Sequence, residues 1–146
     1  MTMTNKDLNE FLKLNDKHLE APPFLKILGF KCASIADDHT SFTCIFLPST
    51  ELTHSNGTIV QGGFVASMLD ATMAQFMIVM SQGQRMPLTL DMNITYLLPC
   101  VPNQDIEVIS TIIKNGRSIV FTEAKLYQSN KLIALSSASN KMVDMN

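Results

Sequence analysis

The sequence lacks any stripe of positive charge. Its 11 Lys and Arg residues are outnumbered by 13 Asp and Glu residues, which gives a net charge of −2 over 146 residues. Binding to nucleic acid or to an anionic membrane surface uses clustered basic side chains. We therefore expect neither nucleic acid nor a membrane among the partners of this chain.

Cysteine is scarce and irregularly spaced. Cys32, Cys44 and Cys100 are odd in number and form no CxxC pair, which argues against a disulfide framework. The first residues contain no apolar core of the kind found in secretory signals. These two absences predict a cytoplasmic location with reduced thiols.

Metal-binding spacing, repeats and linkers are also missing. His18, His39 and His54 show no ligand spacing, so we expect no metal site. No repeat, low-complexity tract or linker divides the chain, and 146 residues can bury a substantial core. The sequence thus predicts one domain over residues 1–146.

The order of predicted elements indicates the α+β class. We expect an N-terminal helix at about residues 5–19, two strands, a long central helix that begins at Gly62-Gly63 and ends near Ser81-Gln82-Gly83, and then four strands. A single apolar helix needs a curved antiparallel sheet wrapped around it to bury its faces. The predicted strands are Lys26–Ser34, Ser41–Leu47, Leu88–Tyr96, Ile106–Lys114, Ser118–Gln128 and Leu132–Met142, with turns at Asn115-Gly116 and Ser129-Asn130.

The central helix contains one ionised residue, Asp70, in the run 61–80. Ala, Leu and Met favour helix, and apolar residues fall on nearly every face, so the helix should be buried. Ser67, Thr72 and Gln75 interrupt the run, which favours a core helix over a membrane span. An unpaired carboxylate in apolar surroundings costs several kcal/mol or more, roughly. Asp70 is therefore the first catalytic candidate.

Gly62-Gly63 lies where the central helix begins. The first N–H groups of a helix have no partner within the helix, and with the helix dipole they favour a developing negative charge, as on a thioester oxygen under attack. Asp70 follows Gly62 by eight residues, which is about 12 Å along a helix axis. Both groups could reach one carbonyl only if they came from two subunits with antiparallel helices. A site built from these groups therefore implies a dimer interface.

Three segments resemble the hotdog-fold acyl-CoA thioesterases of the phenylacetate type, also called PaaI-like. The first is Asn56-Gly57-Thr58-Ile59-Val60-Gln61-Gly62-Gly63 followed by Asp70. The second is Thr89-Leu90-Asp91-Met92-Asn93-Ile94-Thr95-Tyr96-Leu97-Leu98-Pro99, and the third is Asn115-Gly116-Arg117-Ser118. The resemblance covers about residues 24–142. It implies a helix wrapped in a curved antiparallel sheet and pairing into a dimer and often a tetramer.

The same resemblance implies hydrolysis of acyl-CoA to a free acid and coenzyme A, without a cofactor. Asp70 would be the nucleophile or general base, and the Gly62 N–H from the other subunit would polarise the carbonyl. Thr89 would help to hold the attacking water. Gln61 stands where many members have His, so it could donate a hydrogen bond near the carbonyl but could not shuttle a proton. Activity should fall on acidification, because Asp70 must be ionised.

Three further positions have weaker assignments in this interpretation. Gly63 belongs to the close-approach pair and is grouped with the substrate-binding residues. Asn56 lies one residue out of register with the family's asparagine, because Ser55 occupies that position. Arg117 could meet a coenzyme A phosphate, but an ordinary solvated Arg fits equally well.

Other interpretations stay open from sequence alone. Asp70 could serve structure by bonding Ser67 or Thr72, and Thr89 could be a solvated position on one strand face with Asp91. A non-catalytic acyl-CoA-binding module could share the fold. A hotdog dehydratase or hydratase is a weaker alternative, because those enzymes usually carry a histidine where this chain has Gln61.

Overall fold

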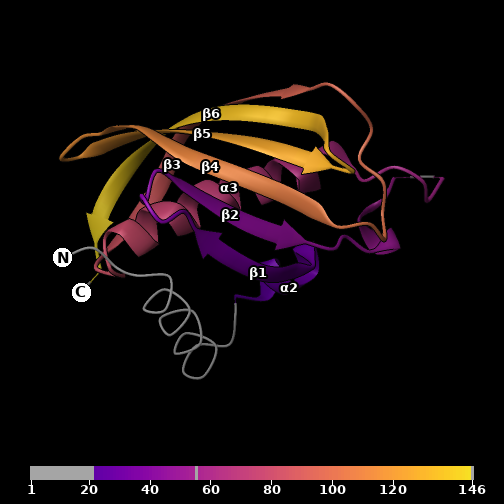
Figure 1. Cartoon of the computed structure of the whole chain (residues 1–146), viewed down its shortest axis with the longest axis horizontal. Helices are drawn as coiled ribbons and strands as arrows, with labels where there is room; N and C mark the ends of the chain where they lie inside the picture. The colour runs from indigo at the N-terminus through magenta and orange to yellow at the C-terminus, as the bar shows by residue number, and fades with distance from the viewer. Residues whose placement is uncertain (1–21, 55, 146) are drawn as a thin grey trace.

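The computed structural model describes residues 22–54 and 56–145. A 19-residue helix, α3 (Gly62–Met80), lies against the concave face of one six-stranded antiparallel sheet (Figure 1). This arrangement confirms the predicted α+β class and the wrapped central helix. In spatial order the strands are β1 (Phe30–Ile35), β2 (Ser41–Phe46), β4 (Ile106–Asn115), β5 (Ile119–Gln128), β6 (Lys131–Asp144) and β3 (Arg85–Tyr96).

Helix α3 supplies much of the core. Nine of its residues are buried, and Phe76 stacks on Phe42 of β2 with ring centroids 5.6 Å apart. The helix is long and apolar enough to cross a membrane by length and composition, but here the sheet curves around it. The side of α3 nearest β3 stays partly open, as at Ser67 and Asp70.

The segment predicted as the start of the first strand is helical instead. Helix α2 (Pro23–Leu28) includes residues 26–28, and the strand β1 begins only at Phe30. Pro23 occupies the first turn of the helix, where its missing N–H costs nothing. Leu25 and Leu28 are buried and attach α2 to the core. The predicted N-terminal helix at 5–19 lies outside the described residues.

The predicted turns place the last three strands correctly. Asn115 ends β4 and Ile119 begins β5, so the Asn115-Gly116 signal marks a real hairpin. Ser129 and Asn130 both have positive φ, 51° and 61°, between β5 and β6, as a two-residue hairpin turn requires. A short 3-10 helix, η1 (Thr50–Leu52), precedes the loop that leads to α3.

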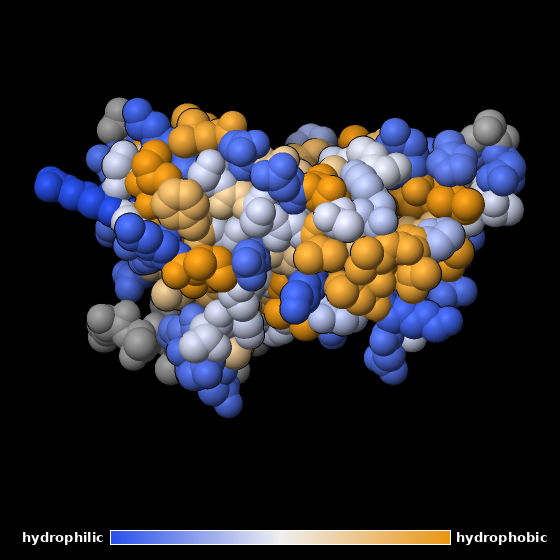
Figure 2. Space-filling model, turned by 90° about the horizontal axis from the view of Figure 1, so that it is seen from above, coloured by the Kyte–Doolittle hydropathy of each residue, from blue (hydrophilic) through white to orange (hydrophobic). Residues whose placement is uncertain are grey.

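Strand β3 lies at one edge of the sheet and pairs only with β6 among the described strands. It is 12 residues long and unusually exposed for an apolar strand. From above, hydrophobic side chains gather over this edge (Figure 2). The exposed apolar side chains of β3 and the segment after it are Met86, Leu88, Leu90, Tyr96, Leu97 and Leu98.

Candidate functional site

Within residues 22–54 and 56–145, one backbone N–H at the start of α3 has no acceptor. From Val60 to Val65, the N–H groups of Val60 and Gln61 donate to Cys100 O and Leu52 O, and those of Phe64 and Val65 donate to Gln61 O. The N–H of Gly63 donates to the side chain of Gln61. Among the described residues, no acceptor faces the N–H of Gly62, the first residue of the helix. This donor lies at the positive end of the helix dipole, where a developing oxyanion is stabilised.

Gln61 is the N-cap residue of α3. Its Oε1 accepts from Gly63 N at 2.7 Å, so the Gly63 N–H is occupied and cannot also bind a substrate oxygen in this arrangement. A Cβ on Gly63 would lie 2.8 Å from the same Oε1. The capping role of Gln61 was not part of the sequence interpretation, which considered only a hydrogen bond near the carbonyl.

Asp70 is half-buried and receives a hydrogen bond from Thr89. The Thr89 Oγ1 donates to Asp70 Oδ1 at 2.8 Å across 19 residues of sequence. A bulge between Thr89 and Asp91 interrupts the β3–β6 register, and Asp91 lines a shallow cavity on the sheet together with Ser137 and Ser139. Thr89 therefore does not share a face with Asp91, because bulges re-aim side chains. The Thr89 side chain is exposed as well as hydrogen-bonded to Asp70.

Gly62 and Asp70 cannot meet within one chain. Both lie on the continuous helix α3, eight residues and thus about 12 Å apart along its axis. A cavity of about 330 Å³ opens beside Gly62, lined also by Tyr96, Leu97 and Leu98, but neither Asp70 nor Thr89 is part of its lining. One chain therefore presents two separate halves of the expected site.

Two predicted binding residues, Asn56 and Arg117, are not part of the lining of the cavity beside Gly62. Asn56 uses its Oδ1 within its own loop, where it accepts from the N–H and hydroxyl of Thr58. Arg117 is exposed in the β4–β5 hairpin, and its carbonyl accepts from Arg85, the first residue of β3. That hairpin lies at the C-terminal end of α3, opposite to Gly62.

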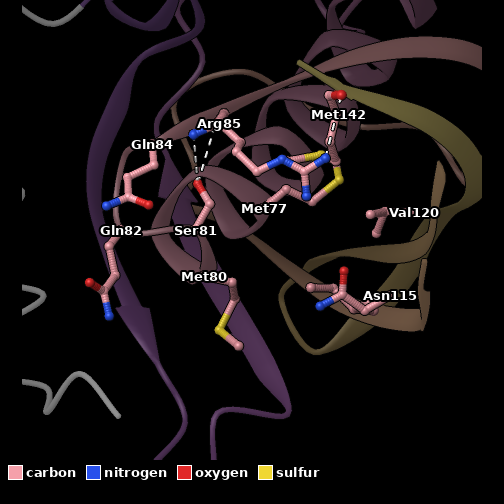
Figure 3. A pocket seen from close by; sticks show the side chains of 10 residues that line it. Met77, Met80, Ser81, Gln82, Gln84, Arg85, Asn115, Val120 and Met142 are labelled. Atoms are coloured by element: carbon pink, nitrogen blue, oxygen red, sulfur yellow. Dashed lines mark hydrogen bonds between the residues drawn. The ribbon is translucent and has the colours of Figure 1, made fainter. Parts of the chain in front are cut away.

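A second cavity, about 390 Å³, lies at this C-terminal end of α3 (Figure 3). Met77, Met80 and Met142 line it together with Arg85. The Arg85 guanidinium donates to Arg117 O at 2.8 Å and to Met142 O at 3.5 Å. Because protein carbonyls occupy this cation, the cavity offers no evident anion site.

The described residues contain no group of three or more His, Cys, Asp or Glu side chains that could hold a metal ion. The buried thiols are also unsuited to nucleophilic chemistry. Burial raises the pKa of Cys100 to about 11 and that of Cys44 to about 12, and the thiolate is the reactive form of cysteine.

Sequence reasoning missed one side chain at the Gly62 half of the site. The Tyr96 hydroxyl donates to Gly62 O at 2.8 Å across 34 residues of sequence. In the sequence, Tyr96 is the last residue of a strand with alternating apolar and polar residues. No nearby residue pattern predicts that this strand ends beside the start of α3.

Fold and site together give an α+β domain with an open N–H donor at the start of its central helix and a hydrogen-bonded carboxylate two turns further on. The chain belongs to the Thioesterase superfamily, whose sequence profile matches residues 57–134. This bears out the prediction of a thioesterase.

The named relatives agree with that family. The chain is 29% identical over 136 residues to acyl-coenzyme A thioesterase 13 of Homo sapiens, covering 92% of this chain and 93% of the relative. Its fold is similar to a phenylacetic acid degradation-related protein from Ralstonia eutropha JMP134, with a TM-score of 0.79, 22% identity and coverage of 91% and 98% of the two chains. It is also similar to the E. coli PaaI protein, with a TM-score of 0.75, 13% identity and coverage of 92% and 94%. The fold is the hotdog fold of the PaaI type.

Proposed function

We propose that this protein hydrolyses acyl-CoA thioesters to a free carboxylic acid and coenzyme A. The observation that carries the proposal is the N–H of Gly62 at the start of α3, which has no acceptor in the part of the chain that the structure describes, whereas the five neighbouring N–H groups all donate hydrogen bonds. A donor fixed in this way is pre-organised for the oxyanion that forms when a thioester carbonyl is attacked. The family and the curated relative support the substrate class.

Asp70 would drive the attack, either directly as a nucleophile or by deprotonating water. Its position favours this role because it is half-buried near the open side of α3 and hydrogen-bonded by Thr89. Direct attack would form a mixed anhydride between Asp70 and the acyl group and break the thioester C–S bond, with coenzyme A leaving as the thiolate, which takes a proton from solvent. Water would then hydrolyse the anhydride to the free acid and regenerate the Asp70 carboxylate. In the general-base route, water supplies the oxygen of the acid and Asp70 takes its proton.

The site would be completed by a second copy of the chain. Edge strand β3 has 12 residues and carries exposed apolar side chains on both sides of its bulge. The opposite edge strand, β1, has only six residues, and its Lys31 is exposed. Long apolar edges invite strand pairing, whereas short or charged edges resist it. Antiparallel pairing of two β3 strands would place the Tyr96 end of one beside the Thr89 end of the other. Gly62 of one chain would then approach Asp70 of its partner, in a dimer that could assemble further into a tetramer.

We also propose that the protein works in a reducing compartment such as the cytoplasm. All three cysteines are free, and two of them are buried. Free cysteines fit a compartment in which thiols stay reduced, and the proposed reaction does not use a cysteine.

The first test is thiol release from a panel of short, long and aromatic acyl-CoAs. We expect hydrolysis by the wild type and a loss of several hundred-fold or more in kcat for Asp70→Asn, with unchanged thermal stability. Tight acyl-CoA binding without thiol release would instead favour the non-catalytic binding module. Equal rates in both proteins would remove Asp70 from the mechanism.

A matched pair at Gly62 tests the N–H donor itself. Gly62→Pro deletes the N–H at the first helical position, where proline fits, and Gln61 already has the extended φ and ψ of −65° and 137° that a following proline requires. Gly62→Ala adds the same Cβ next to the Tyr96 ring, 3.3 Å from its Cζ, but keeps the N–H. We expect Gly62→Pro to lose about 100-fold or more in kcat relative to Gly62→Ala. Equal activity of the two variants would contradict the oxyanion role.

A further inference from the structure

Tyr96 joins the end of edge strand β3 to the first turn of α3. Its hydroxyl donates to Gly62 O at 2.8 Å, and its ring lies so close to Gly62 that an added Cβ would be 3.3 Å from Cζ and 3.4 Å from the hydroxyl oxygen. Tyr96 is nevertheless about half exposed, at 51%. The side chain is therefore a wall of the cavity beside Gly62 as well as a hydrogen-bond donor.

The hydrogen bond acts on the peptide unit next to the open N–H. Gly62 O and Gly63 N belong to one peptide plane, and this plane is held at both ends, by the Tyr96 hydroxyl at the oxygen and by Gln61 Oε1 at the nitrogen. The preceding plane, which carries Gly62 N–H, is held at its oxygen by Phe64 N and Val65 N. Gly62 is the hinge between the two held planes.

A hinge made of glycine needs such support. Gly62 and Gly63 have no Cβ and so little intrinsic preference for one backbone conformation. Oxyanion donors contribute to catalysis in proportion to how well they are fixed before the reaction. The Tyr96 hydroxyl, which comes from β3, restricts the backbone conformation of these two glycines through its hydrogen bond to Gly62 O. It leaves the Gly62 N–H free to bind the substrate.

We propose that Tyr96 is a positioning residue of the oxyanion hole, which holds Gly62 through its carbonyl so that the Gly62 N–H faces the thioester carbonyl. The inference rests on the proposed hydrolysis of acyl-CoA at this site. Tyr96 takes no proton and forms no bond to the substrate in this role. Its contribution should appear in the chemical step and not in ground-state binding.

The test compares Tyr96→Phe with Tyr127→Phe. Phenylalanine keeps the ring against Gly62 and removes only the hydroxyl, whereas Tyr127 lies on β5 and does not line the cavity beside Gly62. We expect Tyr96→Phe to lower kcat by about 5- to 10-fold, the usual value of one hydrogen bond. KM should change less than 2-fold, roughly, because only the chemical step is affected, and the acid side of the pH–rate profile should keep its shape because Asp70 is untouched. Tyr127→Phe should match the wild type.

Backbone hydrogen exchange gives a readout that does not depend on turnover. The amides at the start of α3 should exchange faster in Tyr96→Phe than in Tyr127→Phe, while those in the middle of the helix should not change. Unchanged kcat and unchanged exchange in Tyr96→Phe would overturn the inference while wild-type hydrolysis upheld the proposed function. A raised KM with unchanged kcat would also overturn it, since Tyr96 would then act by binding substrate. If the wild type releases no thiol from any acyl-CoA, the proposed function and this inference fall together.

Discussion

Cys44 and Cys100 are buried in the fold, whereas Cys32 on β1 is exposed. Burial raises the pKa of Cys44 to about 12 and that of Cys100 to about 11, from a usual value of 9.0. Both thiols therefore stay protonated and unreactive at pH 8. We expect iodoacetamide to label one thiol per native chain rapidly and all three after denaturation. Cys32→Ser should abolish the rapid phase, and two rapid thiols in the native wild type would contradict the assignment.

The same two pKa shifts set the direction of the alkaline pH dependence of stability. In the unfolded chain these thiols lose their protons from about pH 9, while in the folded chain they keep them to about pH 11 and pH 12. The unfolded state then binds fewer protons, so the free energy of unfolding falls as the pH rises from about 9 toward 12. Urea unfolding at pH 8 and pH 10 should show this decrease, and Cys44→Ala should reduce it.

Thr89 shows where prediction from sequence stops at the level of single residues. A hydroxyl near Asp70 was expected there from family resemblance, but alternation along the strand gave it the same face as Asp91. The bulge between Thr89 and Asp91 breaks that alternation and turns the hydroxyl toward α3. A bulge depends on the pairing partner, here β6, and leaves no mark in a period-two pattern. Tyr96 was missed for a related reason, because its contact with Gly62 spans 34 residues.

At the level of elements, the N-cap of α3 is a side chain that sequence rules rarely place there. Gln61 Oε1 accepts from Gly63 N at 2.7 Å, and an N-cap oxygen typically stabilises a protein by about 1 kcal/mol relative to alanine. We expect Gln61→Ala to lower the free energy of unfolding by about this amount, and the melting temperature by about 4 °C. Gln61→Ser, which offers a good cap oxygen, should recover most of the loss. Equal stability of the Ala and Ser variants would show that the cap contributes nothing.

Helices and strands marked by a long apolar run or by turn residues were predicted well. Those whose position depends on contacts with distant parts of the chain were not. The long apolar run gave α3, and the turn signals at Asn115-Gly116 and Ser129-Asn130 gave the β4–β5–β6 meander. The segment 26–28 was predicted as strand yet is helical, because Pro23 starts a helix that Gly29 ends with φ of 79°. A Cβ on Gly29 would overlap Leu47 O, so this exit from the helix is fixed by close backbone packing against the residue that follows β2. The strand order, with β3 beside β6, is likewise a long-range property.

At the scale of the whole molecule, the exposed β3 edge supports our proposal that the active unit is larger than one chain. Leu90 is the extra residue of the bulge and is 58% exposed. A lysine there should oppose pairing of two β3 edges, as charged residues do on natural edge strands. We expect Leu90→Lys to reduce the mass in solution from that of a dimer or tetramer to that of the 16.2 kDa chain, with loss of hydrolysis. Ile27→Lys, at a site on α2 that is also 58% exposed, is the matched control and should change neither property.

Mixing two inactive variants tests whether each site takes its groups from both chains. A heterodimer of Asp70→Asn and Gly62→Pro contains one site with both defects and, if the site is shared, one site with both groups intact. Co-refolding the two variants should therefore restore hydrolysis to an appreciable fraction of the wild-type rate, although each alone is inactive. If both groups acted within one chain, every site in the mixture would carry one defect and activity would not return. Restoration would require Gly62 and Asp70 to act across the interface, which is the arrangement that about 12 Å of intervening helix demands.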